Sequence, residues 1–64
     1  MLKVKFDNKD HFLEGNQLTV GLILKKMKIN PEMVLISKNG ELVLEDEVVT
    51  EKDSVEVLKV VSGG

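Results

Sequence analysis

The chain ends in two glycines, Gly63 and Gly64, which follow Ser62 and leave a terminal carboxylate. An α-carboxyl group has a reference pKa of about 3.5, so it is ionised at neutral pH and can attack the α-phosphate of ATP. Glycine has no Cβ, so this backbone can enter a narrow channel and adopt dihedral angles closed to other residues. These features indicate a tail that is inserted into another protein's active site. The alternative is an unstructured end with no role.

The other residues whose side chains could take part in catalysis or bind a metal form no catalytic or metal-binding set. His11 is the only histidine, so we interpret it as a solvated strand residue rather than a metal ligand. Ser62 has no base nearby in sequence and is expected to be a spacer in the tail. The acidic stretch 45–53 could steer a basic partner, although a solvated loop is the simpler interpretation. It predicts no glycosidase site, because no pocket is available to raise one carboxyl pKa.

Length and composition narrow the class of protein. The 64 residues make one domain, 1–64, with little room for a deep cleft beside its core. Hydrophobic residues make up 42% and charged residues 31%, as in a soluble globular chain. The chain has nine lysines, no arginine, no tryptophan and no tyrosine, and its net charge is −2. Nucleic-acid binding is therefore not expected, because arginine and aromatic rings supply most of it.

Location and cofactor content follow from what the sequence lacks. It contains no cysteine, so disulfides and cysteine-ligated metal sites are excluded and the cytoplasm is favoured. No signal segment opens the chain, and no apolar stretch approaches about 18 residues, so no membrane span is expected. We expect a cytoplasmic, non-enzymatic domain without a bound metal or cofactor.

Alternating apolar residues predict strands at both ends of the chain. Leu2, Val4 and Phe6 share one face of the first strand, and 54–61 forms the last. These two strands are the most apolar, so we expect them to pair at the centre of the sheet, in parallel. After a turn at 7–10, a second strand is predicted at 11–15. The register of this strand stays open because Phe12 and Leu13 are adjacent and cannot face the same side of the sheet. Whichever of the two faces outward could extend an apolar patch on the outside of the sheet.

The stretch 18–31 predicts a helix, capped by Thr19 and followed by Pro31. Lysines crowd its C-terminal end, where the helix dipole favours cations. Gly21 costs about 1 kcal/mol inside a helix and would allow a close contact between helix and sheet. The apolar residues that form one stripe at i, i+3, i+4 and i+7 are Val20, Ile23, Leu24 and Met27.

Asn39-Gly40 between two apolar runs predicts a hairpin with a type I′ turn. The acidic stretch 45–53 shows no period and is predicted to be a loop, with room for one helical turn. The resulting order is strand, strand, helix, strand, strand, loop and strand. We therefore expect an α+β fold in which one main helix packs on one face of a mixed sheet of four to five strands.

Three motifs resemble the ThiS/MoaD sulfur-carrier family, which has the ubiquitin-like β-grasp fold. "TVGLILKKM" from Thr19 resembles the family's helix, and "KNGELV" from Lys38 resembles its hairpin. "EKDSVEVLKVVSGG" resembles the family's Val-rich ending, although Lys52 stands where glycine is common. The length and the Val-Val-Ser-Gly-Gly ending are closer to ThiS than to MoaD. The first 18 residues match only as a pair of strands.

The resemblance implies a mechanism centred on Gly64. An adenylyltransferase similar to ubiquitin-activating enzymes would use ATP and magnesium to adenylate the Gly64 carboxylate. Sulfur from a persulfide donor would then displace AMP and leave a thiocarboxylate. A sulfur-accepting synthase of thiamine, molybdopterin or thiolated-tRNA biosynthesis would receive the sulfur. Two alternatives stay open: a ubiquitin-like modifier joined through Gly64 to lysines, and an interaction domain with a passive tail.

The last strand carries apolar residues on both faces. Val55 and Val57 are expected in the core, which leaves Leu58 and Val60 on a face that would otherwise be polar. Apolar residues beside a reactive tail favour a partner-docking surface, whereas single exposed apolar residues are ordinary. The predicted docking residues are Leu58, Val60, Val61 and Ser62, which lead into a flexible tail at 62–64 that ends in Gly63 and Gly64.

Overall fold

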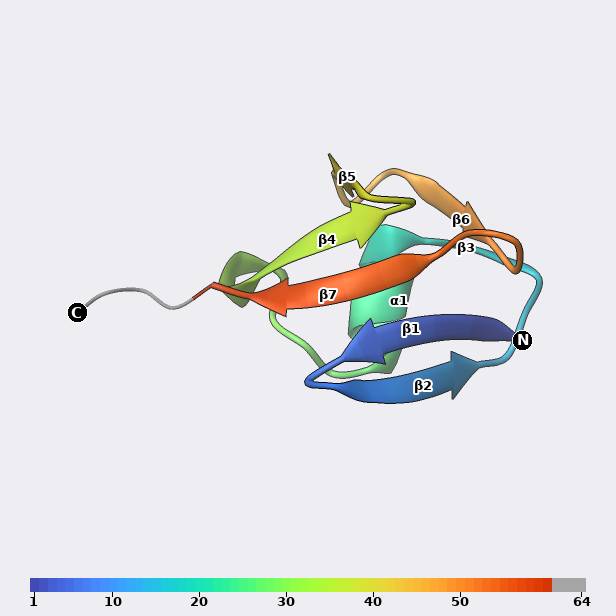
Figure 1. Ribbon diagram of the computed structural model, residues 1–64, viewed down its shortest axis with the longest axis horizontal. Helices are drawn as coiled ribbons and strands as arrows, with labels where there is room; N and C mark the ends of the chain where they lie inside the picture. The colour runs from blue at the N-terminus through green and yellow to red at the C-terminus, as the bar shows by residue number, and fades with distance from the viewer. Residues whose placement is uncertain (61–64) are drawn as a thin grey trace.

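The computed structural model describes residues 1–60. Within this range, five strands form one mixed sheet in the order β2-β1-β7-β4-β5, and a single α-helix crosses one face of it (Figure 1). This arrangement confirms the predicted α+β fold with a five-stranded mixed sheet. The elements are β1 (Leu2–Phe6), β2 (Lys9–Leu13), α1 (Val20–Lys26), β4 (Val34–Lys38), β5 (Glu41–Val43) and β7 (Val55–Lys59).

The first and last strands pair in parallel at the centre of the sheet, as predicted, with Val4 beside Val55. The β1–β2 connection is tighter than expected, because only Asp7 and Asn8 form the turn, with φ of 56° and 62°. The second strand therefore covers 9–13 rather than 11–15. This register places Phe12 outside, 61% exposed, and packs Leu13 against the core.

Helix α1 is shorter than the predicted 18–31. Thr19 caps it as expected, because its Oγ1 accepts a hydrogen bond from the amide of Leu22 at 3.3 Å. The helix stops because Lys28 adopts a left-handed φ of 58°, and Ile29 N donates to Leu24 O at 2.9 Å. These bonds are those of a Schellman motif, with lysine where glycine is usual. A 3₁₀ helix, η1 (Pro31–Met33), then leads into β4.

A second, two-stranded sheet was not predicted. Strand β3 (Gln17–Thr19) pairs antiparallel with β6 (Val48–Thr50), and Leu18 lies opposite Val49. The prediction that 45–53 is a loop is therefore wrong for 48–50. Strands of three residues are too short to show a period, so the pattern gave no signal. The predicted start of the helix at Leu18 is also wrong, because Leu18 belongs to β3.

Gly21 makes its close contact with the segment after β5, not with the sheet as predicted. Its amide donates to Glu45 O at 2.9 Å, and the amide of Val20 donates to Glu47 O at 2.9 Å. A Cβ at position 21 would lie 3.5 Å from Glu45 O. The backbone of 45–47 thus satisfies the first free amides of α1, which have no partner within the helix.

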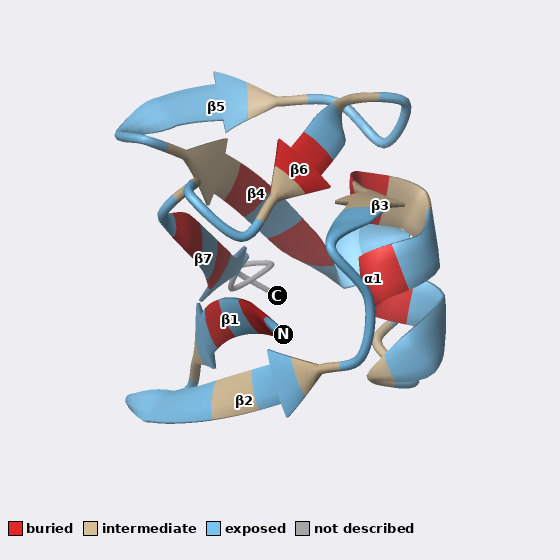
Figure 2. Ribbon diagram, turned by 90° about the vertical axis from the view of Figure 1, so that its right-hand side faces the viewer, coloured by how far each residue is buried: buried red, intermediate tan, exposed pale blue. Residues whose placement is uncertain are grey.

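The core lies between α1 and the inner face of the sheet, where the buried segments of both layers face each other (Figure 2). Within residues 1–60 it contains no buried polar side chain, and no helix is long and apolar enough to cross a membrane. Met27, the last residue of the predicted stripe, is only partly buried. The buried residues of the core are Leu2, Val4, Val20, Ile23, Leu24, Val34, Ile36, Val49, Val55 and Val57.

The Asn39-Gly40 turn has φ of 53° and 87°, as a type I′ turn requires. The side chain of Asn39 ties this turn to the start of β7: its Nδ2 donates to Asp53 Oδ1 at 3.0 Å, and its Oδ1 accepts from Ser54 N at 2.9 Å. Asp53 Oδ2 also accepts from the amide of Thr50 at 2.8 Å. The Thr50 amide, with Asn39, holds the pKa of Asp53 below its usual value.

Candidate functional site

The last described residue, Val60, follows β7 and lies beside η1. The amide of Val60 donates a hydrogen bond to Met33 O at 3.0 Å, which fixes the point from which the tail continues. The C-terminal end of β7 lies at the end of the molecule opposite the N-terminus (Figure 1). The predicted site residues Val61, Ser62, Gly63 and Gly64, and with them the predicted flexible tail, lie outside the described residues.

Within β7 the alternation is as predicted, because Val55 and Val57 are buried and Leu58 is 39% exposed. Val60 follows the strand and is 43% exposed, but it lines a hollow together with Phe6 and Met27, which pack against the core, so the prediction that it shares the outer face with Leu58 is wrong. Leu58 lies directly opposite Leu35 of β4 on the outer face of the sheet. Leu42 of β5 is diagonal to Leu35, because it lies opposite Ser37.

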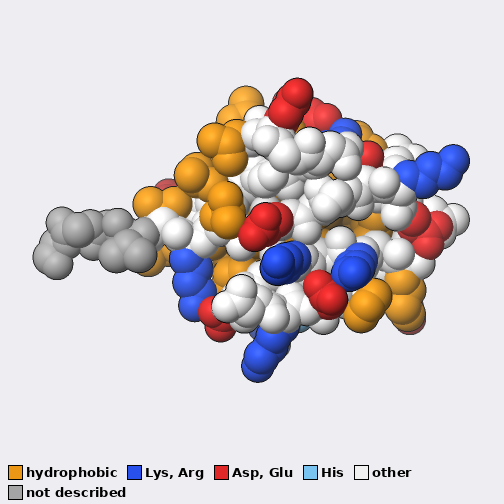
Figure 3. All heavy atoms as spheres, viewed as in Figure 1, with side chains coloured by type: hydrophobic (Ala, Val, Ile, Leu, Met, Phe, Trp, Pro, Cys, Tyr) orange, Lys and Arg blue, Asp and Glu red, His pale blue; other side chains and the backbone are white. Residues whose placement is uncertain are grey.

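We call Leu35, Leu42 and Leu58 the outer leucine surface. All three side chains are exposed. Figure 3 shows the hydrophobic side chains gathered between β5 and the end of β7. Sequence reasoning found Leu58 but missed Leu35 and Leu42. The only signal in the sequence was that each of these leucines stands next to a residue expected to be buried in its strand, and so faces outward. That signal identifies a shared surface only once the pairing of β4 with β7 and β5 is known.

Phe12 does not extend this surface. It lies opposite Lys3 of β1, at the far end of the sheet from Leu58. Lys3 forms an ion pair with Asp10 at 3.7 Å on the same outer face. The side chain of Lys5, opposite Glu56, also lies between Phe12 and Leu58. The idea that the outward residue of the second strand enlarges the docking surface is therefore wrong.

Val60 lines a separate hollow of about 450 Å³, which we call the tail-side groove. Phe6, Met27 and Met33 form much of its apolar lining, and the lysines at positions 28 and 59 lie at its rim. Lys59 Nζ stands 5.5 Å from the centre of the Phe6 ring, within range of a cation–π interaction. Two apolar features thus adjoin the end of β7: the outer leucine surface and the tail-side groove.

His11 is half-buried, not solvated as predicted. It lies opposite Val4, and its ring is 6.1 Å from that of Phe6 at an angle of 49°. Within residues 1–60 no three His, Cys, Asp or Glu side chains are grouped closely enough to hold a metal ion.

Comparison with known proteins gives one consistent result. Residues 3–64 match the model of the ThiS family. An uncharacterised protein of Archaeoglobus fulgidus is 39% identical over 98% of this chain and 97% of its own length. The sulfur carrier protein TtuB of Thermus thermophilus is 33% identical over 91% of this chain and 88% of its own.

A solved structure supports the same assignment. The crystal structure of the thiamine biosynthesis protein ThiS from Geobacter metallireducens superimposes with a TM-score of 0.71 and 26% identity. It covers 98% of this chain and 100% of that one. The predicted β-grasp fold and the predicted likeness to sulfur carriers are both confirmed. The chain therefore belongs to the ThiS family.

Proposed function

We propose that this protein is a sulfur carrier that acts through the carboxylate of Gly64. The observation that carries the proposal is a ThiS-family match that extends to residue 64, on a chain that ends in Gly-Gly. The 33% identity to a protein named as a sulfur carrier supports the same role. In this proposal the carrier is not an enzyme but the substrate of an ATP-dependent adenylyltransferase.

The chemistry takes place in two stages. A carboxylate oxygen of Gly64 attacks the α-phosphate of ATP, pyrophosphate leaves, and an acyl-adenylate forms with magnesium in the partner enzyme. The terminal sulfur of a persulfide donor then attacks the acyl carbon and AMP leaves. Cleavage of the resulting acyl disulfide by a thiol releases the thiocarboxylate. The partner supplies positioning and charge stabilisation, because the carrier contributes only the nucleophile.

The docking step falls to the residues around the end of β7. Leu58 and the rest of the outer leucine surface are exposed apolar side chains, and a partner that covers them gains the free energy of burying apolar area. The tail-side groove, with Val60 inside and Lys28 and Lys59 at its rim, suits an apolar side chain flanked by acidic residues. We propose that the adenylyltransferase contacts both features while the tail, including Val61 and Ser62, enters its active site.

The pathway that receives the sulfur is proposed to be thiamine biosynthesis, through a sulfur-accepting synthase. A solved relative is named for that pathway. Molybdopterin synthesis and tRNA thiolation use the same terminal chemistry and are the competing pathways. Protein conjugation is a different outcome of the same activation, in which lysine amines replace sulfur as the nucleophile.

The experiment measures ATP–pyrophosphate exchange with the host's adenylyltransferase. The full chain should support exchange, and the chain without Gly64 should support none, because a carboxylate one residue short cannot reach the α-phosphate. Gln17→Ala, an exposed change in β3, is the matched control and should behave like the full chain. Exchange that continues without Gly64 would refute the proposal. Lysine conjugates on a denaturing gel would point to the modifier function instead.

A further inference from the structure

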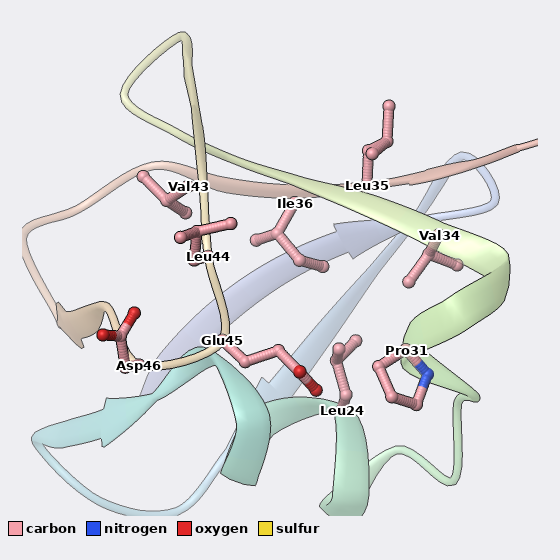
Figure 4. A pocket seen from close by; sticks show the side chains of 9 residues that line it. All are labelled: Leu24, Pro31, Val34, Leu35, Ile36, Val43, Leu44, Glu45 and Asp46. Atoms are coloured by element: carbon pink, nitrogen blue, oxygen red, sulfur yellow. The ribbon is translucent and has the colours of Figure 1, made fainter.

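A second apolar hollow opens on the other side of η1, with a volume of about 510 Å³. Figure 4 shows Leu24 of α1, Ile36 of β4 and Leu44 after β5 around it, with the side chains of Glu45 and Asp46 beside them. We call it the acid-rimmed groove. It shares Val34 with the tail-side groove and Leu35 with the outer leucine surface.

The groove exists because α1 is too short to cover the whole sheet. Seven helical residues span only about 10 Å. The helix lies behind the central strands, and within residues 1–60 no helix lies beneath β5 at the edge of the sheet (Figure 1). Val43, on the inner face of β5, is consequently only half-buried, and Leu44 is 78% exposed. Leu44 is the most exposed leucine of the molecule and contributes little to its core.

The charge at the rim is negative and unpaired. Neither carboxylate, of Glu45 or of Asp46, has a hydrogen-bond or ion-pair partner within residues 1–60. The neighbouring Glu47 differs, because Lys38 Nζ binds its carboxylate at 2.9 Å. The stretch 41–47 contains four acidic residues and no lysine, whereas the tail-side groove carries two lysines. The two grooves therefore attract side chains of opposite charge.

The free edge of β5 adds a backbone template. One edge of β5 pairs with β4, and the other has no strand beside it within residues 1–60. An extended segment can pair with such an edge and place alternate side chains into adjoining pockets. A segment along β5 would lie beside the groove, because Val43 of β5 and the residues that follow it, Leu44 to Asp46, line it.

We propose that the acid-rimmed groove binds an extended segment of a partner protein in which one aliphatic side chain has lysine or arginine two residues away on either side, on the same face of the segment. The aliphatic side chain enters between Leu24 and Ile36, and the cations lie over Glu45 and Asp46. This surface is separate from the reactive tail, so it can be occupied while the tail lies in another protein's active site. The proposal goes beyond the carrier chemistry and does not depend on it.

The test is an NMR titration of the ¹⁵N-labelled full chain with the peptide acetyl-Arg-Thr-Leu-Thr-Arg-amide, in which the leucine and both arginines share one face of an extended strand. Saturable shifts are expected at the amides of Leu24, Ile36 and Leu44, with a Kd on the order of 1 mM or below. Replacing the peptide's leucine with serine should weaken binding at least about fivefold, because the aliphatic side chain loses its pocket. Replacing both arginines with glutamate should abolish it.

Variants of the protein locate the site. Leu44→Ser and Glu45→Gln should each weaken binding at least about threefold. Phe12→Ser, a change of an exposed residue at the opposite edge of the sheet, should leave binding unchanged, and so should removal of the last two residues. That truncation separates this proposal from the carrier function. Absence of saturation up to about 5 mM, equal binding of the serine peptide, or shifts centred on Val60 would each overturn the proposal.

Discussion

Truncating Val49 to alanine tests the unpredicted second sheet. Val49 lies in β6 and is completely buried, whereas its neighbour Val48 is 39% exposed. The two residues are the same type, in the same strand, on opposite faces. If 48–50 forms the strand seen here, the same truncation should have very different costs at these two positions.

The magnitude follows from burial. Removing two buried carbon groups from Val49 costs about 1.6 kcal/mol of transfer free energy, at about 0.8 kcal/mol each. A residual cavity of about 50 Å³ adds about 1 kcal/mol, so we expect Val49→Ala to lower the free energy of unfolding by about 2–3 kcal/mol. Val48→Ala should cost about 1 kcal/mol or less, because part of its side chain is already hydrated and no closed cavity forms.

The assay is urea unfolding followed by far-ultraviolet circular dichroism, since the chain has neither tryptophan nor tyrosine as a fluorescent probe. With an m-value of about 1 kcal/mol/M, the midpoint should fall by roughly 2–3 M for Val49→Ala and by about 1 M or less for Val48→Ala. A domain of this length has only about 3–10 kcal/mol in total, so the first change is large. Equal shifts for the two variants would refute the burial of Val49 and the strand that causes it.

Three further predictions concern substitutions of individual residues. Thr19→Ala should destabilise the protein by about 1 kcal/mol in the same urea assay, because the amide of Leu22 loses its cap, whereas Thr19→Ser should retain most of the stability. Asp53 has a folded pKa below its ordinary 3.8, so its stabilisation is present above that pH and is lost as the pH falls through the lower folded value. Urea midpoints measured downward from pH 5 should therefore fall less steeply for Asp53→Asn than for the unmodified chain, and parallel curves would contradict this. Leu58→Ser should raise the KM for the adenylyltransferase several-fold without lowering the urea midpoint, and Leu35→Ser should do the same, since both side chains are exposed in the free carrier. An unchanged KM would exclude the outer leucine surface from docking.

The presence of helix α1 and the Asn39-Gly40 turn could be predicted from the sequence because their signals are local. The apolar spacing of Val20, Ile23 and Leu24 and the cap at Thr19 lie within one short segment. Asn39-Gly40 specifies its turn through two left-handed residues. The parallel pairing of β1 with β7 also followed, because these are the two most apolar strands. In each case the side chains that decide the structure are neighbours in sequence or dominate the composition of their strand.

The second sheet could not be predicted because each of its strands depends on the other. Val48, Val49 and Thr50 are β-branched, but three residues between acidic neighbours show no period. Leu18 directly precedes the cap residue Thr19, so the local pattern assigns it to the start of the helix instead of to a strand. The pairing of Leu18 with Val49 links positions 31 residues apart and is decided by tertiary packing.

The surfaces depend on the same long-range geometry. Leu58 could be predicted as exposed, since it alternates with Val55 and Val57 along one strand. Leu35 joins it only through the pairing of β4 with β7. The acid-rimmed groove arises from the difference between the length of α1 and the width of the sheet. No single segment of sequence encodes that difference.

The most direct measurement for the central claim is the intact mass of the full chain after reaction with the adenylyltransferase, ATP, magnesium and a persulfide donor. The proposed function predicts a mass increase equal to the replacement of one oxygen by sulfur, located by fragmentation at Gly64. The increase should require ATP and should be absent from a chain lacking Gly63 and Gly64. An unchanged mass under conditions in which the adenylyltransferase modifies another carrier, or a sulfur atom located elsewhere in the chain, would contradict the account.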